Sequence, residues 1–343
     1  MQKYGRTIQL LNDLVDDRIV PGMSWVIFDR DTQLQAVRGL AQWRPEPEVL
    51  TDQMQFDLAS LTKVVGTVPL MLQLWQEGYF KMDQPVTAFL PELGSSKSTI
   101  RNLFTHSSDI GGWIPHRDEL NAQQLTAALL KTQEVGPSVG KKIHYADVNF
   151  IYLGWIAERI LHQPVHRLIE QRVLAPLRMS ASTFQPEVNR AVPTSITKSR
   201  GLIRGTVHDP KGYVLGAHCG SAGLFSTAAD LTHFGRLLIE DNLGGLLTSQ
   251  TVDQLFTDQT PLSGEHLRSF GWKLHHSRTN DHHLVICHTG YTGTLMILDR
   301  VEDQGLILLT NRVHPRPDNQ EFIKRRGQLM AAYLAEKNHP ALG

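Results

Sequence analysis

The sequence lacks several features that would place it in a large functional class at once. It has only two cysteines, Cys219 and Cys287, which are too few and too scattered for a disulfide framework or a four-ligand zinc site. No stretch approaches the roughly eighteen consecutive apolar residues of a membrane-spanning helix. Lysine plus arginine and aspartate plus glutamate both total 34, so there is no basic excess to attract nucleic acid or an anionic membrane. We therefore expect neither a nucleic-acid nor a membrane partner.

The first residues also lack the apolar core of a secretory signal peptide. The segment MQKYGRTIQLLNDLVDDRIVPGM carries Asp13, Asp16 and Asp17 where a signal peptide is apolar. The sequence therefore predicts a cytoplasmic protein.

Strand-like and helical patterns are unevenly distributed along the 343 residues. Apolar runs typical of strands occur at 23–31 and 34–43, and then only between 270 and 311. The chain between them is mainly helical in pattern, and a last helical pattern covers 319–335. Because consecutive hairpin-like strands favour an antiparallel sheet, we predict an α+β fold. Its antiparallel sheet is built from both chain ends, is flanked by helices and carries an inserted, mainly helical subdomain.

This distribution also gives approximate boundaries within a single domain of residues 1–343. We expect an α/β lobe at about 1–60 and 265–343 and a helical lobe at about 61–264. A cleft between the lobes is the default place for a ligand. The weakly patterned stretch 186–222 is long for a simple connection, so it is either a functional loop over the cleft or a disordered surface excursion.

The segment DLASLTKVVGT, residues 57–67, places Ser60 and Lys63 three positions apart where an extended run turns into a helix. Side chains at this spacing share one helix face, so the lysine amine can reach the serine hydroxyl. Free N–H groups at a helix start also favour developing negative charge. Both residue types are common at ordinary helix starts, so the pair alone leaves a catalytic and a structural role open. Pro69 is expected to kink this helix.

Two further segments could complete a catalytic site. In HYADVNF, Tyr145 comes just before a helix that begins near Asp147, and a phenol close to cations can accept and return a proton. In HTGYTGT, residues 288–294, glycines at a strand end let the backbone approach a ligand closely. Each segment alone also fits a plain structural role, as a packing tyrosine or a hairpin turn.

Together, S-x-x-K, Y-x-D and H-T-G follow one another in the order of the penicillin-recognising serine enzymes. The sequence resembles this superfamily, the serine β-lactamases and penicillin-binding proteins. Within it, the closest resemblance is to the branch of class C β-lactamases, DD-peptidases of the same type and related esterases, whose second motif begins with tyrosine. Segments such as IRNLFTHSSDIGGW, GSAGLFSTAADLTHFGRLL and LTNRVHPRP extend the similarity over about residues 22–335. The resemblance implies a β-lactamase-like catalytic domain that acts as a serine hydrolase.

The resemblance also implies roles for individual residues. Ser60 would be the acylated nucleophile, and Lys63 would keep its hydroxyl poised for deprotonation. Tyr145 would act with Lys63 as the general base and relay the proton to the leaving group. His288, the first residue of the third motif, completes the catalytic set.

The remaining positions of the motifs are expected to hold the substrate. The backbone N–H groups of Ser60 and Tyr291 would form an oxyanion hole. Asp147, Thr289 and Gly290 would bind substrate.

No metal and no organic cofactor is expected. The segments DHH at 281–283 and AHCG at 217–220 are interpreted as a solvated turn and a loop, because no further ligands accompany them at zinc spacing. The expected partner is a small-molecule ester, amide or β-lactam.

Two departures from the family pattern bear on the choice of substrate. Histidine stands at 288 instead of lysine and is mostly neutral at pH 7, and Asp147 stands where many relatives have asparagine. An anionic β-lactam is therefore expected to be held less firmly than an ester or amide, and DD-peptidase activity ranks third. The absence of a visible export signal also favours an intracellular substrate. A penicillin-binding or sensing protein without turnover, and an acyltransferase, stay open as alternatives.

Overall fold

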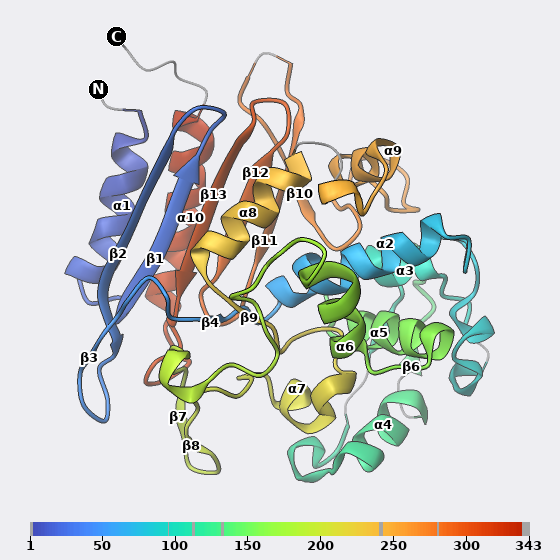
Figure 1. Ribbon diagram of the computed structural model, residues 1–343. Coiled ribbons are helices and arrows are strands. Elements are labelled where there is room, and N and C mark those ends of the chain that lie inside the picture. Colours follow the sequence, from blue (N-terminus) through green and yellow to red (C-terminus); the bar gives the residue numbers. More distant parts are fainter. Residues whose placement is uncertain are drawn as a thin grey trace.

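The computed structural model describes residues 3–94, 96–111, 114–131, 134–239, 243–279 and 281–337. Within these ranges, a seven-stranded antiparallel sheet lies beside a mainly helical part (Figure 1). The α-helices are α1 Gly5–Asp16, α2 Val68–Gln76, α3 Ile100–Phe104, α4 Ala122–Lys131, α5 Val148–Leu161, α6 Val165–Ile169, α7 Pro210–Leu215, α8 Ala228–Ile239, α9 Ser249–Asp253 and α10 Gln320–Glu336. The strands are β1 Gly22–Phe28, β2 Gln33–Gln42, β3 Glu48–Val49, β4 Phe56–Asp57, β5 Ile110–Gly111, β6 Glu134–Val135, β7 Ile196–Thr197, β8 Gly201–Leu202, β9 Phe225–Ser226, β10 Lys273–His276, β11 Leu284–Thr289, β12 Leu295–Asp299 and β13 Gln304–Thr310.

The large sheet joins the two ends of the chain, which confirms the predicted α+β class. Its order is β10-β11-β12-β13-β1-β2-β3. Strand β1 pairs with its sequence neighbour β2 and also with β13, where Met23 lies opposite Thr310 and Phe28 opposite Gly305. Every residue of β1, β12 and β13 is buried, because helices cover both faces of the sheet.

Three helices cover the sheet. Helices α1 and α10 pack against one face, where Leu14 and Phe322 meet Trp25 in one apolar cluster. Helix α8 crosses the other face, and its Gly235 lies against Phe28 (Figure 1). Helix α8 falls within the range 61–264 that the sequence assigns to the helical lobe, yet it packs on the sheet. The division into lobes at about 1–60 and 265–343 and at about 61–264 stays a prediction.

The helix after Ser60 begins with an irregularity. Residues Lys63–Thr67 form a π-helical turn, and α2 follows at Val68 with Pro69 in its first turn. The helical segment is continuous over residues 61–76, so Pro69 lies inside it, directly after the π-helical turn. The kink expected at Pro69 stays a prediction. Beyond it, α5 runs through the centre of the helical part and is buried from Val148 to Ala157.

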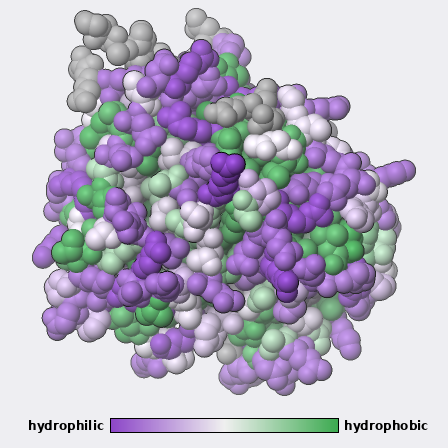
Figure 2. Space-filling model, viewed as in Figure 1, coloured by the Kyte–Doolittle hydropathy of each residue, from purple (hydrophilic) through white to green (hydrophobic). Residues whose placement is uncertain are grey.

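The stretch 186–222 is folded and contains β7, β8 and α7. Hydrogen bonds hold it to distant parts of the chain: the Arg204 guanidinium donates to Glu48, and the Ser195 hydroxyl donates to the carbonyl of Val313. In the described residues, no helix is long and apolar enough to cross a membrane. Hydrophilic residues cover most of the face seen in Figure 2.

Candidate active site

Ser60 lies at a sharp turn between strand β4 and the π-helical turn. The preceding residue, Ala59, has a left-handed backbone with φ of 47°, a conformation that costs an alanine about 1–2 kcal/mol. Its N–H donates to Oδ1 of Asp57 at 2.8 Å, and Asp57 is fixed by pairing of β4 with β9. The surrounding structure thus maintains a strained backbone directly before the candidate nucleophile, as is common at functional sites.

Lys63 is fully buried and its amine has three acceptors. Nζ donates to Oγ of Ser60 at 2.8 Å, to Oδ1 of Asp147 at 2.9 Å and to the carbonyl oxygen of Ser221 at 3.1 Å. An ammonium has three N–H donors, so all of them are used. Burial disfavours the charged amine, but the attraction of Asp147 and Tyr145 outweighs it and raises the pKa of Lys63. Lys63 is therefore an ammonium in the resting site.

Asp147 is shared between two lysines. Its Oδ1 accepts from Lys63, and its Oδ2 lies 2.9 Å from Nζ of Lys211, in the first turn of α7. Asp147 is the N-terminal cap residue of α5, yet its side chain caps no backbone N–H because both oxygens are engaged by the lysines. Burial would raise the pKa of this carboxyl, but Lys63 and Lys211 together hold it below its usual range.

Tyr145 stands at the mouth of the site. Its side chain is 42% exposed, and its ring packs at a tilt of 35° against His106, with 4.4 Å between ring centroids. Nζ of Lys63 lies 5.3 Å from the centroid of the tyrosine ring. The phenol is thus held beside both the ammonium and the cavity.

The third motif docks directly on the segment before Ser60. The hydroxyls of Thr292 and Thr294 donate to the carbonyl oxygens of Asp57 and Leu58 at 2.7 and 3.0 Å. A Cβ on Gly290 would lie 2.5 Å from the Leu58 carbonyl oxygen, so this close approach requires glycine.

Two backbone donors are left free by this arrangement. In the described part of the chain, neither the N–H of Ser60 nor that of Tyr291 donates to a protein acceptor. The carbonyl of Tyr291, by contrast, accepts from Nε of Arg312 at 2.8 Å, which fixes the orientation of the turn. Free N–H groups of this kind suit an oxyanion.

His288 is buried and neutral. Burial lowers its pKa well below the usual value, and repulsion by Lys63 and Arg268 adds to the effect. The histidine of the third motif therefore supplies no positive charge, as expected from its residue type.

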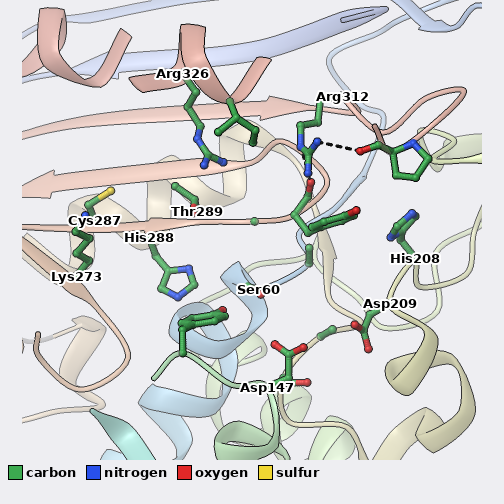
Figure 3. A pocket seen from close by; sticks show the side chains of 18 of the residues that line it. Ser60, Asp147, His208, Asp209, Lys273, Cys287, His288, Thr289, Arg312 and Arg326 are labelled. Atoms are coloured by element: carbon green, nitrogen blue, oxygen red, sulfur yellow. Dashed lines mark hydrogen bonds between the residues drawn. The ribbon is translucent and has the colours of Figure 1, made fainter. Parts of the chain in front are cut away.

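A cavity of about 720 Å³ opens at Ser60 (Figure 3). Seven residues predicted from the motifs line it, and Lys63 lies just behind Ser60; the seven are Ser60, Tyr145, Asp147, His288, Thr289, Gly290 and Tyr291. The stretch 186–222 contributes further wall residues, among them His208, Asp209 and Ser221. The structure thus brings all the predicted site residues together.

Sequence reasoning missed three cations on one side of this cavity. Arg268, Lys273 and Arg326 line it, and Figure 3 shows Lys273 and Arg326 on the side opposite Asp147 and Asp209. None of the three forms an ion pair with a carboxylate of the described residues. None of the three belongs to a catalytic motif. The sequence offers one hint of the cavity wall, because Ile323, Arg326 and Met330 are spaced to lie on a single face of α10.

Metal chemistry has no visible ligand set in the described ranges. No group of three or more histidine, cysteine, aspartate or glutamate side chains there is arranged to hold an ion. Both cysteines, Cys219 and Cys287, are buried free thiols.

Comparisons with known proteins agree with this geometry. The family model "Beta-lactamase" matches residues 7–329. A "Putative D-alanyl-D-alanine carboxypeptidase" of Escherichia coli (strain K12) is 27% identical over 328 residues, covering 80% of this chain and 73% of the relative. An "N-acetylmuramyl-L-alanine amidase" of Bacillus subtilis (strain 168) is 24% identical over 316 residues, covering 78% and 70%.

The fold is similar to that of a solved structure described as "A class C beta-lactamase". The TM-score is 0.77 at 19% identity, and the match covers 99% of this chain and 97% of the other. The sequence, the fold and the residues around Ser60 thus agree. The chain belongs to the Beta-lactamase family, and it is a serine hydrolase.

Proposed function

We propose that the protein cleaves an amide or ester bond through an acyl-enzyme on Ser60. The observation that carries this proposal is the 2.8 Å hydrogen bond from the buried Lys63 ammonium to Oγ of Ser60 at the cavity floor. This bond holds the hydroxyl oxygen in one place and leaves its own proton to be removed by another group.

Tyr145 is the group proposed to move that proton. Lys63 keeps all three of its protons, so it stabilises negative charge on Ser60 and Tyr145 instead of acting as a base. Tyr145 enters this step as a phenolate beside the Lys63 ammonium. As Oγ of Ser60 bonds to the substrate carbonyl carbon, its proton passes to the phenolate oxygen. The same proton then goes to the leaving group when the scissile bond breaks. A water molecule repeats the sequence to release the acid and restore Ser60.

The negative charge of the tetrahedral intermediate is assigned to the two free backbone donors. The N–H groups of Ser60 and Tyr291 would both point at the carbonyl oxygen, and such a donor contributes a factor of roughly 10² to 10³ in rate. Thr289 and Gly290 then border the substrate, and Asp147 acts through Lys63.

We further propose that the substrate carries a carboxylate next to the bond that is cleaved. From the sequence, His288 and Asp147 predict that an anionic substrate is held weakly. In the structure, Lys211 pairs with Asp147. Arg268, Lys273 and Arg326, which form no ion pair with a carboxylate of the described residues, supply positive charge at the cavity wall. The carboxypeptidase name of the Escherichia coli relative is consistent with a free carboxylate.

A matched pair of substrates tests this proposal. A thioester peptide ending in a free carboxylate should be hydrolysed about tenfold or more faster, in kcat/KM, than the same compound ending in a carboxamide. Arg268→Met and Arg326→Met should remove most of this difference, while the exposed Lys324→Met on the same helix serves as the control. Equal rates for both substrates would refute carboxylate recognition, and unchanged hydrolysis by Ser60→Ala would refute the acyl-enzyme.

A further inference from the structure

Four charged groups alternate in sign from the nucleophile to the start of α7. Lys63 meets Asp147 at 2.9 Å, Asp147 meets Lys211 at 2.9 Å, and Lys211 meets Asp209 at 3.5 Å. Asp209 in turn accepts from the N–H of Gly212 at 2.7 Å and so caps α7. The formal charges of these four groups sum to zero.

Lys211 decides how Asp147 engages Lys63. Because Lys211 takes Oδ2, only Oδ1 is left for Lys63, and the other two protons of Lys63 go to Ser60 and Ser221. Lys211 itself is partly buried, with 17% of its side chain exposed, and it does not line the cavity. It therefore acts on the reaction through Asp147 and not by direct contact with the cavity.

We propose that Lys211 is a positioning residue for acylation, which balances the charge of Asp147 so that Lys63 is directed at Ser60. This inference rests on the proposed acyl-enzyme function. Without Lys211 the remaining three groups carry a net negative charge, which opposes both the removal of the serine proton and the formation of the oxyanion. Asp147 could then also engage Lys63 with both oxygens and draw it away from Ser60.

A double variant that restores the charge balance distinguishes this role of Lys211 from a purely structural one. Lys211→Met keeps most of the length of the side chain but removes the positive charge beside Oδ2 of Asp147. Asp147→Asn is isosteric, and its amide oxygen can still accept from Lys63. In the double variant, Lys63 and Asp209 again sum to zero. The experiment measures the rate of covalent labelling by a fluorophosphonate probe, together with kcat and KM for a nitrophenyl ester and the unfolding temperature.

The expected result is a loss of about tenfold or more in the acylation rate of Lys211→Met, carried by kcat with little change in KM. Lys211→Arg should retain most of the rate, and adding Asp147→Asn to Lys211→Met should recover a measurable part of it. The exposed Lys198→Met, from the same stretch of chain, is the control and should match the wild type.

Three outcomes would overturn the proposal. The first is a Lys211→Met variant that is acylated as fast as the wild type. The second is a double variant no faster than Lys211→Met, which would indicate a scaffolding role alone. The third is a wild type that is not acylated at Ser60, which would remove the proposed function together with this inference. If Lys211→Met does not fold, comparing the acylation rates of Lys211→Arg, Asp147→Asn and the double variant still distinguishes charge balancing from a scaffolding role.

Discussion

At the scale of single residues, the protonation of Lys63 determines how the work at Ser60 is divided. A buried ammonium whose three protons are all donated has no lone pair to accept a proton. Tyr145, the first residue of the second motif, lines the same cavity and can accept the proton that Lys63 cannot. The account therefore assigns proton transfer to Tyr145 and electrostatic stabilisation to Lys63.

Removal of the phenolic oxygen tests this assignment. Tyr145→Phe keeps the ring that packs against His106 but lacks the oxygen, so kcat should fall about 10²- to 10⁴-fold with the fold unchanged. The measurement is steady-state hydrolysis of a nitrophenyl ester, with Tyr79→Phe as a control at an exposed position away from the cavity. A phenylalanine variant with wild-type kcat would show that another group moves the proton.

The residues of the site divide into those readable from sequence and those that depend on the fold. Ser60 and Lys63 are three positions apart, so their contact follows from local helix geometry. Arg268 and Lys273 pair in a local β-bridge, whereas Arg326 comes from α10, and only the tertiary structure brings it to the same cavity. No catalytic motif contains these three residues, so the positive charge of the site was not predicted from the sequence.

At the scale of elements, the turn between β11 and β12 is the part that joins the sheet to the nucleophile segment. Its two threonine hydroxyls bind the carbonyls of Asp57 and Leu58, and Gly290 permits the close approach. The position of the N–H of Tyr291, the candidate oxyanion donor, is therefore set by contacts with a segment about 235 residues earlier in the sequence.

A single methyl group should disturb this contact. In Gly290→Ala the new Cβ would lie 2.5 Å from the Leu58 carbonyl oxygen and 2.0 Å from Oγ1 of Thr294. The turn must shift, and acylation of Ser60 should slow by about 10²-fold or more. Labelling by a fluorophosphonate probe measures this, and Gly327→Ala, where nothing lies within 4 Å of the new Cβ, is the control. Equal labelling of Gly290→Ala and the wild type would contradict the assigned role of the turn.

The sequence predicts where helices and strands lie better than it predicts irregular turns within them. Apolar patterns predict the strands at both chain ends and a last helix at 319–335, where α10 lies, because alternation and helical periodicity are local properties. The π-helical turn at Lys63–Thr67 was not predicted, since an apolar segment that is buried on all sides has no periodicity to reveal an extra residue per turn. The stretch 186–222 gave a weak pattern because polar contacts such as that of Arg204 with Glu48 hold it.

At the scale of the whole molecule, several buried histidines are kept neutral. Burial lowers the pKa of His166, His208 and His275 to about 4, and it lowers the pKa of two further histidines at the site even more clearly. The unfolded chain binds protons at these positions below about pH 6.5, whereas the folded chain does not until about pH 4. Five groups with raised pKa values act in the opposite direction: Asp57, whose pKa desolvation raises to about 6, and Glu158, Asp230, His276 and His283. The histidines with lowered pKa values, which include His314, are six.

Stability should therefore decrease on acidification in this window. Because the unfolded state takes up more protons, the free energy of unfolding falls as the pH is lowered from 6.5 towards 4, by about 1.4 kcal/mol per pH unit for each net proton. The unfolding temperature should be clearly lower at pH 5 than at pH 7. His208→Gln removes one of these groups and should reduce the slope. An unfolding temperature that is the same at both pH values would contradict this account.

The segment DHH at 281–283 illustrates a long-range contact that sequence could not reveal. It was interpreted as a solvated turn, but only 10% of the His283 side chain is exposed, and its ring lies between Asp281 and Asp299. Asp299 also binds the buried Lys337. The turn is thus tied to the end of α10 through charges that are distant in sequence.

The central claim is that Ser60 is an acylated nucleophile with turnover, and intact mass tests it most directly. The wild type and Ser60→Ala are exposed briefly to a fluorophosphonate, a nitrophenyl ester and a penicillin, followed by peptide mapping of any adduct. The account predicts a single added group on Ser60 in the wild type, release of the ester-derived acyl group with time, and no adduct on Ser60→Ala. Equal labelling of the two proteins, or an adduct mapped to another residue, would contradict it, and a lasting penicillin adduct with no ester turnover would favour a binding or sensing protein instead.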